Sequence, residues 1–92
     1  MITPTVGRVV LYRPNPDEEH GSLPGLRLAA QIAFVHEGAT QVNLGILDPN
    51  GVHFSRTGVI LAQDREAQPG ECEWMPYQRA VAAGEIPPTQ HA

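Results

Sequence analysis

Lysine is absent from this 92-residue chain, and all six basic residues are arginines. The formal net charge is −4. Proteins that bind DNA or RNA through the phosphates need a concentrated positive surface, so an acidic chain without a basic run is not expected to bind nucleic acid. One or two arginine side chains could still hold a small anion through paired hydrogen bonds.

Cysteine occurs once, as Cys72, so no disulfide can form within the chain. One cysteine and four scattered histidines match no standard zinc-ligand spacing, and we expect no metal site. Glu71 and Glu73 flank Cys72 and disfavour its thiolate, which argues against a catalytic nucleophile and for a small apolar strand residue. A free thiol also fits a reducing cytosol.

Long apolar runs are missing too. No run approaches the ~20 residues that a membrane-spanning helix needs, and the residues after Met1 lack the features of a signal peptide. We find no phosphate-binding glycine loop and no catalytic constellation, so we expect neither a cofactor nor enzyme activity. A core built from 92 residues is only just sufficient for a stable fold, which makes a homo-oligomer the expected state.

Alternating apolar residues and turn signals predict five short strands, at residues 5–12, 27–36, 40–48, 52–61 and 71–75. The alanine-rich segment 27–36 also suits a helix, but its period of two and its turn-forming flanks favour a strand buried on both faces. Asn50 and Gly51 predict a hairpin turn, with the Asp48 carboxylate capping it. Gly45 and Gly58 lie inside predicted strands and indicate bulges or close approaches.

Pro76 at a first helical position and Gly84 as a stop predict a short helix over residues 76–83. Successive hairpin-joined strands curl into a barrel, which also removes unpaired edges. We therefore expect an all-β fold, a small SH3-like β-barrel of four or five antiparallel strands with a short C-terminal helix. Residues 1–84 would form this single domain, and residues 85–92 a flexible tail.

The segment CEWMPYQ, residues 72–78, holds the single Trp and one of the two Tyr. Trp74, Tyr77 and Arg79 could hold a planar anionic ligand such as a nucleotide by stacking and bidentate contacts. The same residues could anchor a subunit interface, and Trp74 could instead plug the open end of the barrel. Further candidates for ligand binding are Arg8 and Arg56, for phosphate contacts, and Asn43, for a base or ribose edge.

His36, His53, Asp48 and Glu37 could in principle gather as metal ligands or acid–base groups. Nothing in their spacing along the strands requires this arrangement. A turn-capping role for Asp48 is favoured over catalysis. We expect no catalytic residues.

Three segments carry a resemblance that covers roughly residues 5 to 79. They are AAQIAFVHEGATQVNLGILDPNG, the strand FSRTGVIL and the ending GECEWMPYQ, after a TVGRVV opening. Together they resemble a family of small proteins encoded by tailed bacteriophages and prophages. Many relatives end in a WHWPE-like motif, from which CEWMPYQ departs, so the role of that motif's His or Glu is not carried over.

The resemblance implies a phage accessory protein acting in the cytoplasm of the infected bacterial host. By analogy with small phage proteins that sequester immune signals, the leading hypothesis is a non-enzymatic, homo-oligomeric binding module for a nucleotide-type signalling molecule. The alternative is an adaptor or inhibitor of a host protein, or a minor virion component. In that case Trp74 and Tyr77 would anchor the interface, and the acidic residues 17–19 would steer a basic partner.

Overall fold

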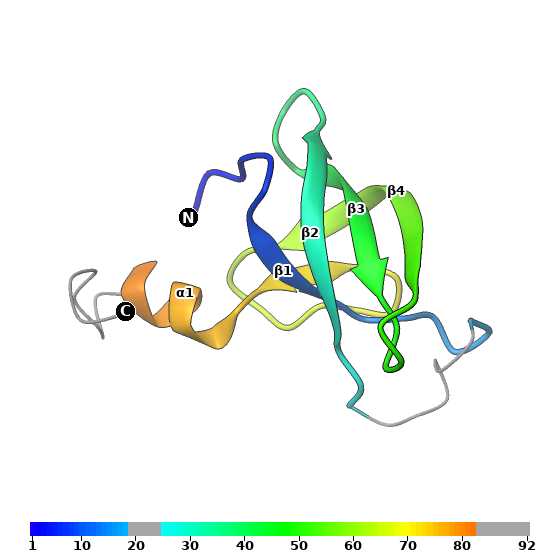
Figure 1. Ribbon diagram of the computed structural model, residues 1–92. Coiled ribbons are helices and arrows are strands. Elements are labelled where there is room, and N and C mark those ends of the chain that lie inside the picture. The colour runs from blue at the N-terminus through cyan, green and yellow to red at the C-terminus, as the bar shows by residue number, and fades with distance from the viewer. Residues whose placement is uncertain (19–24, 83–92) are drawn as a thin grey trace.

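The computed structural model describes residues 1–18 and 25–82, which form a closed five-stranded barrel (Figure 1). Its elements are β1 (Val9–Tyr12), β2 (Leu28–Val35), β3 (Gln41–Leu47), β4 (His53–Ala62), β5 (Cys72–Trp74) and α1 (Pro76–Ala82). The predicted small all-β barrel with a short helix after the last strand is confirmed. The predicted tail at residues 85–92 and the domain end at residue 84 lie outside the described residues.

The strands neighbour one another in chain order, and β5 closes the barrel by pairing with β1. Four of the five pairings are antiparallel, whereas β4 and β5 run parallel, with Leu61 opposite Cys72. The expectation of antiparallel strands therefore needs one correction. A closed ring of five strands cannot alternate direction at every step, so one pair must be parallel.

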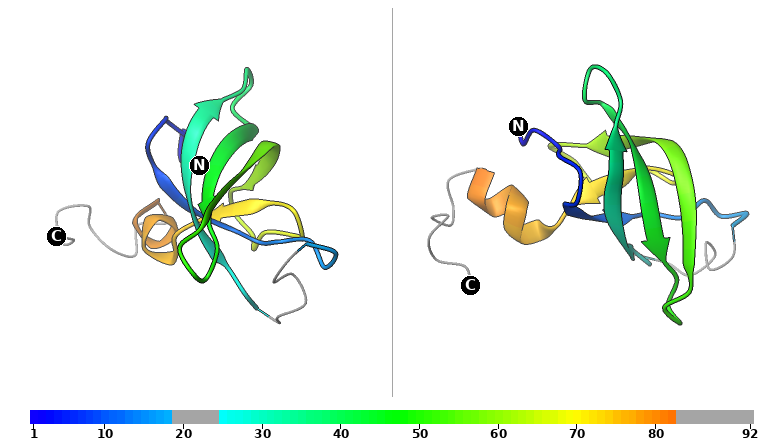
Figure 2. Two further views of the ribbon diagram at one scale, coloured as in Figure 1. Left: turned by 45° about the vertical axis from the view of Figure 1, so that its right-hand side comes forward. Right: turned by 45° about the horizontal axis from the view of Figure 1, so that its top comes forward.

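The prediction that β2 is buried on both faces is wrong. Leu28, Ala30 and Ile32 point into the barrel, whereas Ala29 and Gln31 are exposed on the outside. A barrel wall is a single layer with one inner face, and no helix covers the outside of β2 in the described part of the chain (Figures 1 and 2). The apolar outer residues therefore face solvent.

β1 is shorter than the predicted strand, because the chain turns at Val6 and Gly7 before it enters the barrel. Gly7 has φ 95°, a conformation that side chains with a Cβ rarely adopt. Its N–H donates to the Ile32 carbonyl at 2.8 Å, which ties this turn to β2.

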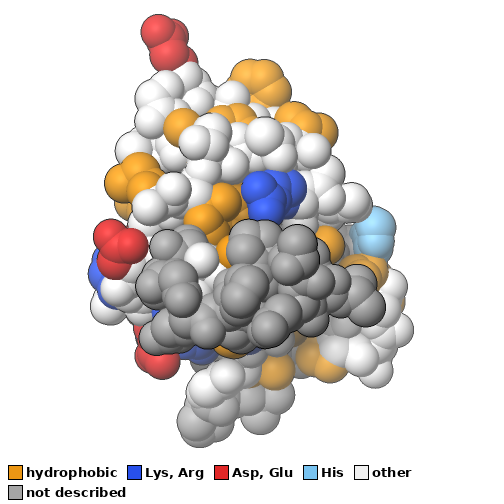
Figure 3. All heavy atoms as spheres, turned by 90° about the vertical axis from the view of Figure 1, so that its left-hand side faces the viewer, with side chains coloured by type: hydrophobic (Ala, Val, Ile, Leu, Met, Phe, Trp, Pro, Cys, Tyr) orange, Lys and Arg blue, Asp and Glu red, His pale blue; other side chains and the backbone are white. Residues whose placement is uncertain are grey.

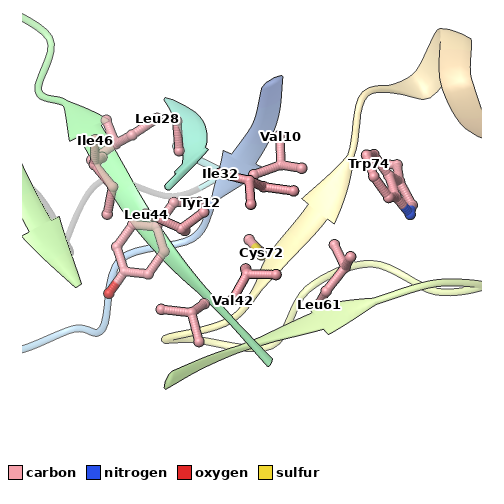
Figure 4. Packing of buried hydrophobic residues seen from close by; sticks show 12 residues of the cluster. Val10, Tyr12, Leu28, Ile32, Val42, Leu44, Ile46, Leu61, Cys72 and Trp74 are labelled. Carbon is pink, nitrogen blue, oxygen red and sulfur yellow. The ribbon is translucent and has the colours of Figure 1, made fainter. Parts of the chain in front are cut away.

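The inward side chains of all five strands form one apolar cluster (Figure 4). Trp74 lies at the end of the cluster near the connection to α1, and the Tyr12 hydroxyl points toward another end of the barrel. The largest fully buried side chains are Trp74, Tyr12, Ile32, Leu44, Ile46, Val10, Val42 and Cys72. α1 projects from the barrel on the side where the N-terminal segment lies (Figure 2).

The β3–β4 hairpin has the predicted turn. The Asp48 carbonyl accepts the Gly51 N–H at 2.9 Å, and the Asp48 carboxylate accepts the N–H groups of Asn50 and Val52, both at 2.8 Å. Gly51 has φ 82°, as such a turn requires. The turn-capping role of Asp48 is confirmed.

The two strand glycines behave differently. Gly58, with φ 64°, lies where the β3–β4 register shifts, so a bulge is confirmed there. Gly45 pairs in regular register with Gln31 and Ser55, so the bulge indicated at that position is absent. No atom comes within 4 Å of where its Cβ would lie, so no close approach explains this glycine either.

Candidate functional site

Trp74 is fully buried, as expected if it closes the barrel. Its indole N–H donates to the Gln63 side-chain oxygen at 3.0 Å. Gln63 also bonds both backbone groups of Ile2, accepting at 3.1 Å and donating at 2.9 Å, which fastens the N-terminal segment beside the indole. The Arg8 guanidinium lies over the indole ring, 5.1 Å from its centroid. Trp74 therefore presents no free face to a ligand in this structure.

Arg79 and Tyr77 lie on α1 and are half-buried. The Arg79 guanidinium is 3.7 Å from one carboxylate oxygen of Glu73, whose other oxygen accepts the Arg27 Nε–H at 2.8 Å. Glu73 faces outward from β5 yet is only 4% exposed, because these arginines and the loop residue Ala67 cover it. The Arg79 charge is thus directed at Glu73 inside the fold.

Arg56 lies at the Tyr12 end of the barrel. Its Nε–H donates to a Glu18 carboxylate oxygen at 2.7 Å, and its guanidinium lies 4.8 Å from the centroid of the Phe54 ring. The Tyr12 hydroxyl donates to the same carboxylate at 2.9 Å, and the Asn15 N–H donates to it at 3.1 Å. Glu18 thus holds the start of the segment between β1 and β2 against the barrel.

These contacts shift the ionisation of both acidic partners. Burial and the neighbouring Glu18 carboxylate raise the pKa of Tyr12 to about 12. Burial alone would raise the pKa of Glu18, but the hydrogen bonds from Arg56, Tyr12 and Asn15 outweigh it and hold that pKa below the usual range. The raised pKa of Tyr12 and the lowered pKa of Glu18 both favour an ionised Glu18 beside a neutral Tyr12.

Asn43 serves the wall of the barrel. Its side-chain oxygen accepts the backbone N–H of Gly58 at 2.9 Å and lies 2.7 Å from Nε2 of His36. Because that oxygen is an acceptor in both contacts, the proton of His36 must reside on Nε2. The six predicted ligand-binding residues are therefore distributed over separate parts of the barrel, although Arg8 and Trp74 are in direct contact.

The side chains considered as a nucleophile or as metal ligands do not form a reactive site in the described part of the chain. Burial, followed by the nearby Glu71 carboxylate, raises the pKa of Cys72 to about 12, so its thiol stays protonated near neutral pH. Among residues 1–18 and 25–82, no group of three His, Cys, Asp or Glu side chains is arranged to hold a metal ion. Within the same residues, no helix is long and apolar enough to cross a membrane.

A feature that the sequence analysis missed is an uncharged outer surface on β1, β2 and β3. The outward positions of these strands carry no Asp, Glu, Lys or Arg, and they surround a shallow groove of about 290 Å³. We call it the outer groove. Its outward lining residues are Val9, Ala29, Gln31, Ala33, Gly45 and Leu47, with His53 at the start of β4.

Small side chains explain the hollow, since alanines and a glycine occupy neighbouring outward positions on β2 and β3. The outer face of an antiparallel sheet is usually polar. Here only Gln31, Gln41 and Asn43 are polar among the outward positions of β1, β2 and β3, and the rest are apolar or glycine, which indicates contact with something else. The signal in the sequence was alanine at positions 29 and 33, on the face of segment 27–36 opposite Leu28, Ala30 and Ile32. We interpreted it as burial on both faces. In the face shown in Figure 3, hydrophobic side chains reach the surface at several points and acidic ones lie at its margins.

Comparison with known proteins adds no relative. No protein-family model, no curated protein and no solved structure matches this chain.

Proposed function

We propose that this protein is a non-enzymatic interaction module that binds another protein chain through the outer groove and the uncharged wall around it. The observation that carries this proposal is the lack of charge on the outward positions of three successive strands. Apolar contact area of this kind is the usual core of a protein–protein interface, where charged residues are depleted. The groove, at about 290 Å³, is at the lower limit for small-molecule pockets.

The use of the charged residues supports the same proposal. Glu18 pairs with Arg56, Glu71 with Arg65, and Glu73 with Arg27 and Arg79. Carboxylates paired in this way stabilise the loops around the barrel. They are poorly placed to serve as general acids or bases, because each is already neutralised by a guanidinium.

The setting follows from the resemblance to small phage proteins. We infer an accessory protein that acts in the cytoplasm of an infected bacterium, where its partner is a host protein or a further copy of itself. This is the adaptor hypothesis of the sequence analysis with a different surface. The buried Trp74 no longer serves as the anchor, and the outer groove takes its place.

A photo-crosslinking experiment tests the proposal. Val9 lines the groove and is 46% exposed, and Ile60 on β4 is 43% exposed and does not line it. A benzophenone amino acid replaces each residue in turn, and the purified protein is irradiated alone and in bacterial lysate. We expect protein adducts from position 9 and few from position 60. Equal yields at the two positions, or none at either, would refute the groove as the binding surface.

A specific observation also favours the nucleotide-binding hypothesis. Arg8 is exposed, its guanidinium is held over Trp74, and no carboxylate lies within ion-pair distance of it among the described residues. Such a guanidinium could receive a phosphate at the barrel end.

A thermal-shift screen against cyclic dinucleotides, cyclic trinucleotides and cyclic ADP-ribose isomers tests this second candidate. A ligand at 100 times its Kd stabilises the folded protein by about 2.7 kcal/mol. The shift should disappear in the Arg8→Gln variant. If none of these ligands raises Tm at concentrations well above micromolar, nucleotide capture is excluded.

A further inference from the structure

Phe34 is turned out of the barrel by a bulge. Leu28, Ala30 and Ile32 alternate inward along β2, so continued alternation would place Phe34 in the core as well. However, Ile32 pairs with Leu44 and Phe34 pairs with the next β3 residue, which leaves Ala33 as an extra residue. Ala33 and Phe34 therefore both lie outside the barrel, and Phe34 is 52% exposed.

Neighbouring contacts fix the bulge. The partner of Phe34 on β3 is Asn43, whose side-chain oxygen is bonded to His36 and to the Gly58 N–H. The second bulge, on β4, lies opposite the same Asn43. The His36 ring also meets the Phe34 ring edge to face, with centroids 5.2 Å apart. The exposed ring is therefore held in position by the fold.

The outer groove has the size and chemistry to receive such a ring. A dry apolar cavity of roughly 150 Å³ holds a benzene molecule, and the groove measures about 290 Å³. At its floor Gly45 contributes no side chain, and Ala29 and Ala33 contribute only methyl groups. Ala33 lines the groove and directly precedes Phe34, so the protruding ring and the hollow belong to the same wall.

We propose that the occupant of the outer groove is a second copy of this chain, in a two-fold dimer in which each copy places Phe34 in the groove of the other. This proposal rests on the proposed function and names its partner. A surface that carries both a protruding ring and a hollow is self-complementary, as a two-fold interface must be.

The distribution of charge also favours this wall as the dimer interface. Two copies with a formal charge of −4 each repel one another, so they associate best where no acidic side chains are brought together. The outward positions of β1, β2 and β3 meet that condition, since none is charged. A basic host protein would gain nothing from this wall. The interface should therefore persist in high salt, unlike one made by ion pairs.

Two variants test the two halves of the contact separately. Gly45→Val fills the groove, and the fold tolerates it because no atom lies within 4 Å of the new Cβ and φ is not positive. Phe34→Ala removes the ring, which is already half exposed. Ile60→Ala is the matched control, since it removes a similarly exposed apolar side chain away from the groove.

Analytical ultracentrifugation over a concentration series measures the association. We expect the unmodified protein and Ile60→Ala to dimerise. Gly45→Val and Phe34→Ala, the two contact variants, should each dimerise about 10- to 100-fold more weakly. An equimolar mixture of Gly45→Val and Phe34→Ala should regain part of the association. In that mixed dimer the Phe34 of the Gly45→Val copy meets the open groove of the Phe34→Ala copy.

Each other outcome overturns the proposal. A protein that stays monomeric up to about 1 mM has no such dimer. A dimer that is unaffected by Gly45→Val and by Phe34→Ala uses another surface. If the mixture of these two variants does not dimerise more strongly than either alone, the Phe34 rings are not exchanged between copies. If the protein is monomeric but position 9 crosslinks a host protein, the dimer fails while the interaction module stands. Circular dichroism and a guanidinium titration of each variant establish that the fold is intact.

Discussion

Replacing Glu18 with Gln should weaken the fold through the barrel end that contains Tyr12. The Glu18 carboxylate accepts hydrogen bonds from Tyr12, Arg56 and the Asn15 backbone, and its side chain is 15% exposed. Breaking a buried ion pair costs about 3–5 kcal/mol, whereas an exposed pair contributes about 0–1 kcal/mol. Arg56 is 41% exposed, so solvent screens this pair substantially, and we expect a loss of about 1–2 kcal/mol.

Urea unfolding followed by Trp74 fluorescence provides the measurement, because the chain contains one Trp and it is fully buried. With a slope near 1 kcal/mol per molar urea, the midpoint should fall by about 1–2 M. The matched control is Glu66→Gln, which changes net charge equally at an exposed site. Its free energy of unfolding should stay within about 0.5 kcal/mol of that of the unmodified protein.

The pH dependence of the stability difference tests whether the ionised Glu18 carboxylate causes it. The pKa of Glu18 is lower in the folded than in the unfolded state, so its contribution is present above the unfolded pKa, about 4.3. The contribution disappears as pH falls through the folded pKa. The gap between Glu18→Gln and the unmodified protein should therefore be largest at pH 6–7 and shrink below about pH 4. A gap that stays constant down to pH 3, or a Glu18→Gln variant as stable as Glu66→Gln at pH 7, would refute this account.

Three further predictions concern the thiol and the wall. Burial and Glu71 raise the pKa of Cys72 to about 12, so iodoacetamide should label it at least about 100-fold more slowly in the native protein than in guanidinium at pH 8. Gly58→Ala should lose about 1 kcal/mol in urea unfolding because φ is 64°, whereas Gly45→Ala should be neutral or gain up to about 1 kcal/mol. Asn43→Ala should lose about 0.5–1.5 kcal/mol in the same assay, because the exposed Gly58 N–H loses its acceptor and turns to water.

The barrel was predictable because the sequence patterns that specify its strands and turns are local. Alternation in segment 27–36 predicts a strand there, and Asp48 with Gly51 fixes the hairpin between β3 and β4. Once strand lengths and turns are given, sheet twist leaves closure as the natural way to remove edges. One parallel pairing follows once five strands close into a ring, but the sequence analysis expected antiparallel strands throughout and did not identify β4 and β5 as that pair.

The candidate site could not be predicted in the same way, because it depends on contacts between distant residues. Glu73 belongs to a strand of three residues that are all buried, yet its carboxylate meets Arg27, 46 positions earlier in the chain. Likewise Gln63 and Ile2 are 61 positions apart. No local pattern in the segment CEWMPYQ shows that Trp74 would be covered by Arg8 and the N-terminal segment.

Phe34 illustrates the limit most clearly. Alternation places it with Ile32, but whether a strand keeps its register depends on its neighbour, and Asn43 stabilises the irregular pairing by accepting the Gly58 N–H. A bulge moves a side chain from the inner to the outer face without any change in local composition. The sequence pattern therefore assigns Phe34 to the core and leaves the outer groove unmarked.

The two closed ends of the barrel limit where binding can take place. At one end Gln63 bonds both the Trp74 indole and the backbone of Ile2, and at the other Glu18 bonds both Tyr12 and Arg56. A ligand that entered the interior would have to break one of these sets and leave buried polar groups unpaired, which costs about 1–3 kcal/mol for each group. The outer wall of β1, β2 and β3 requires no such rearrangement, because its residues are already presented to solvent. Binding through that wall can therefore proceed with the barrel unchanged.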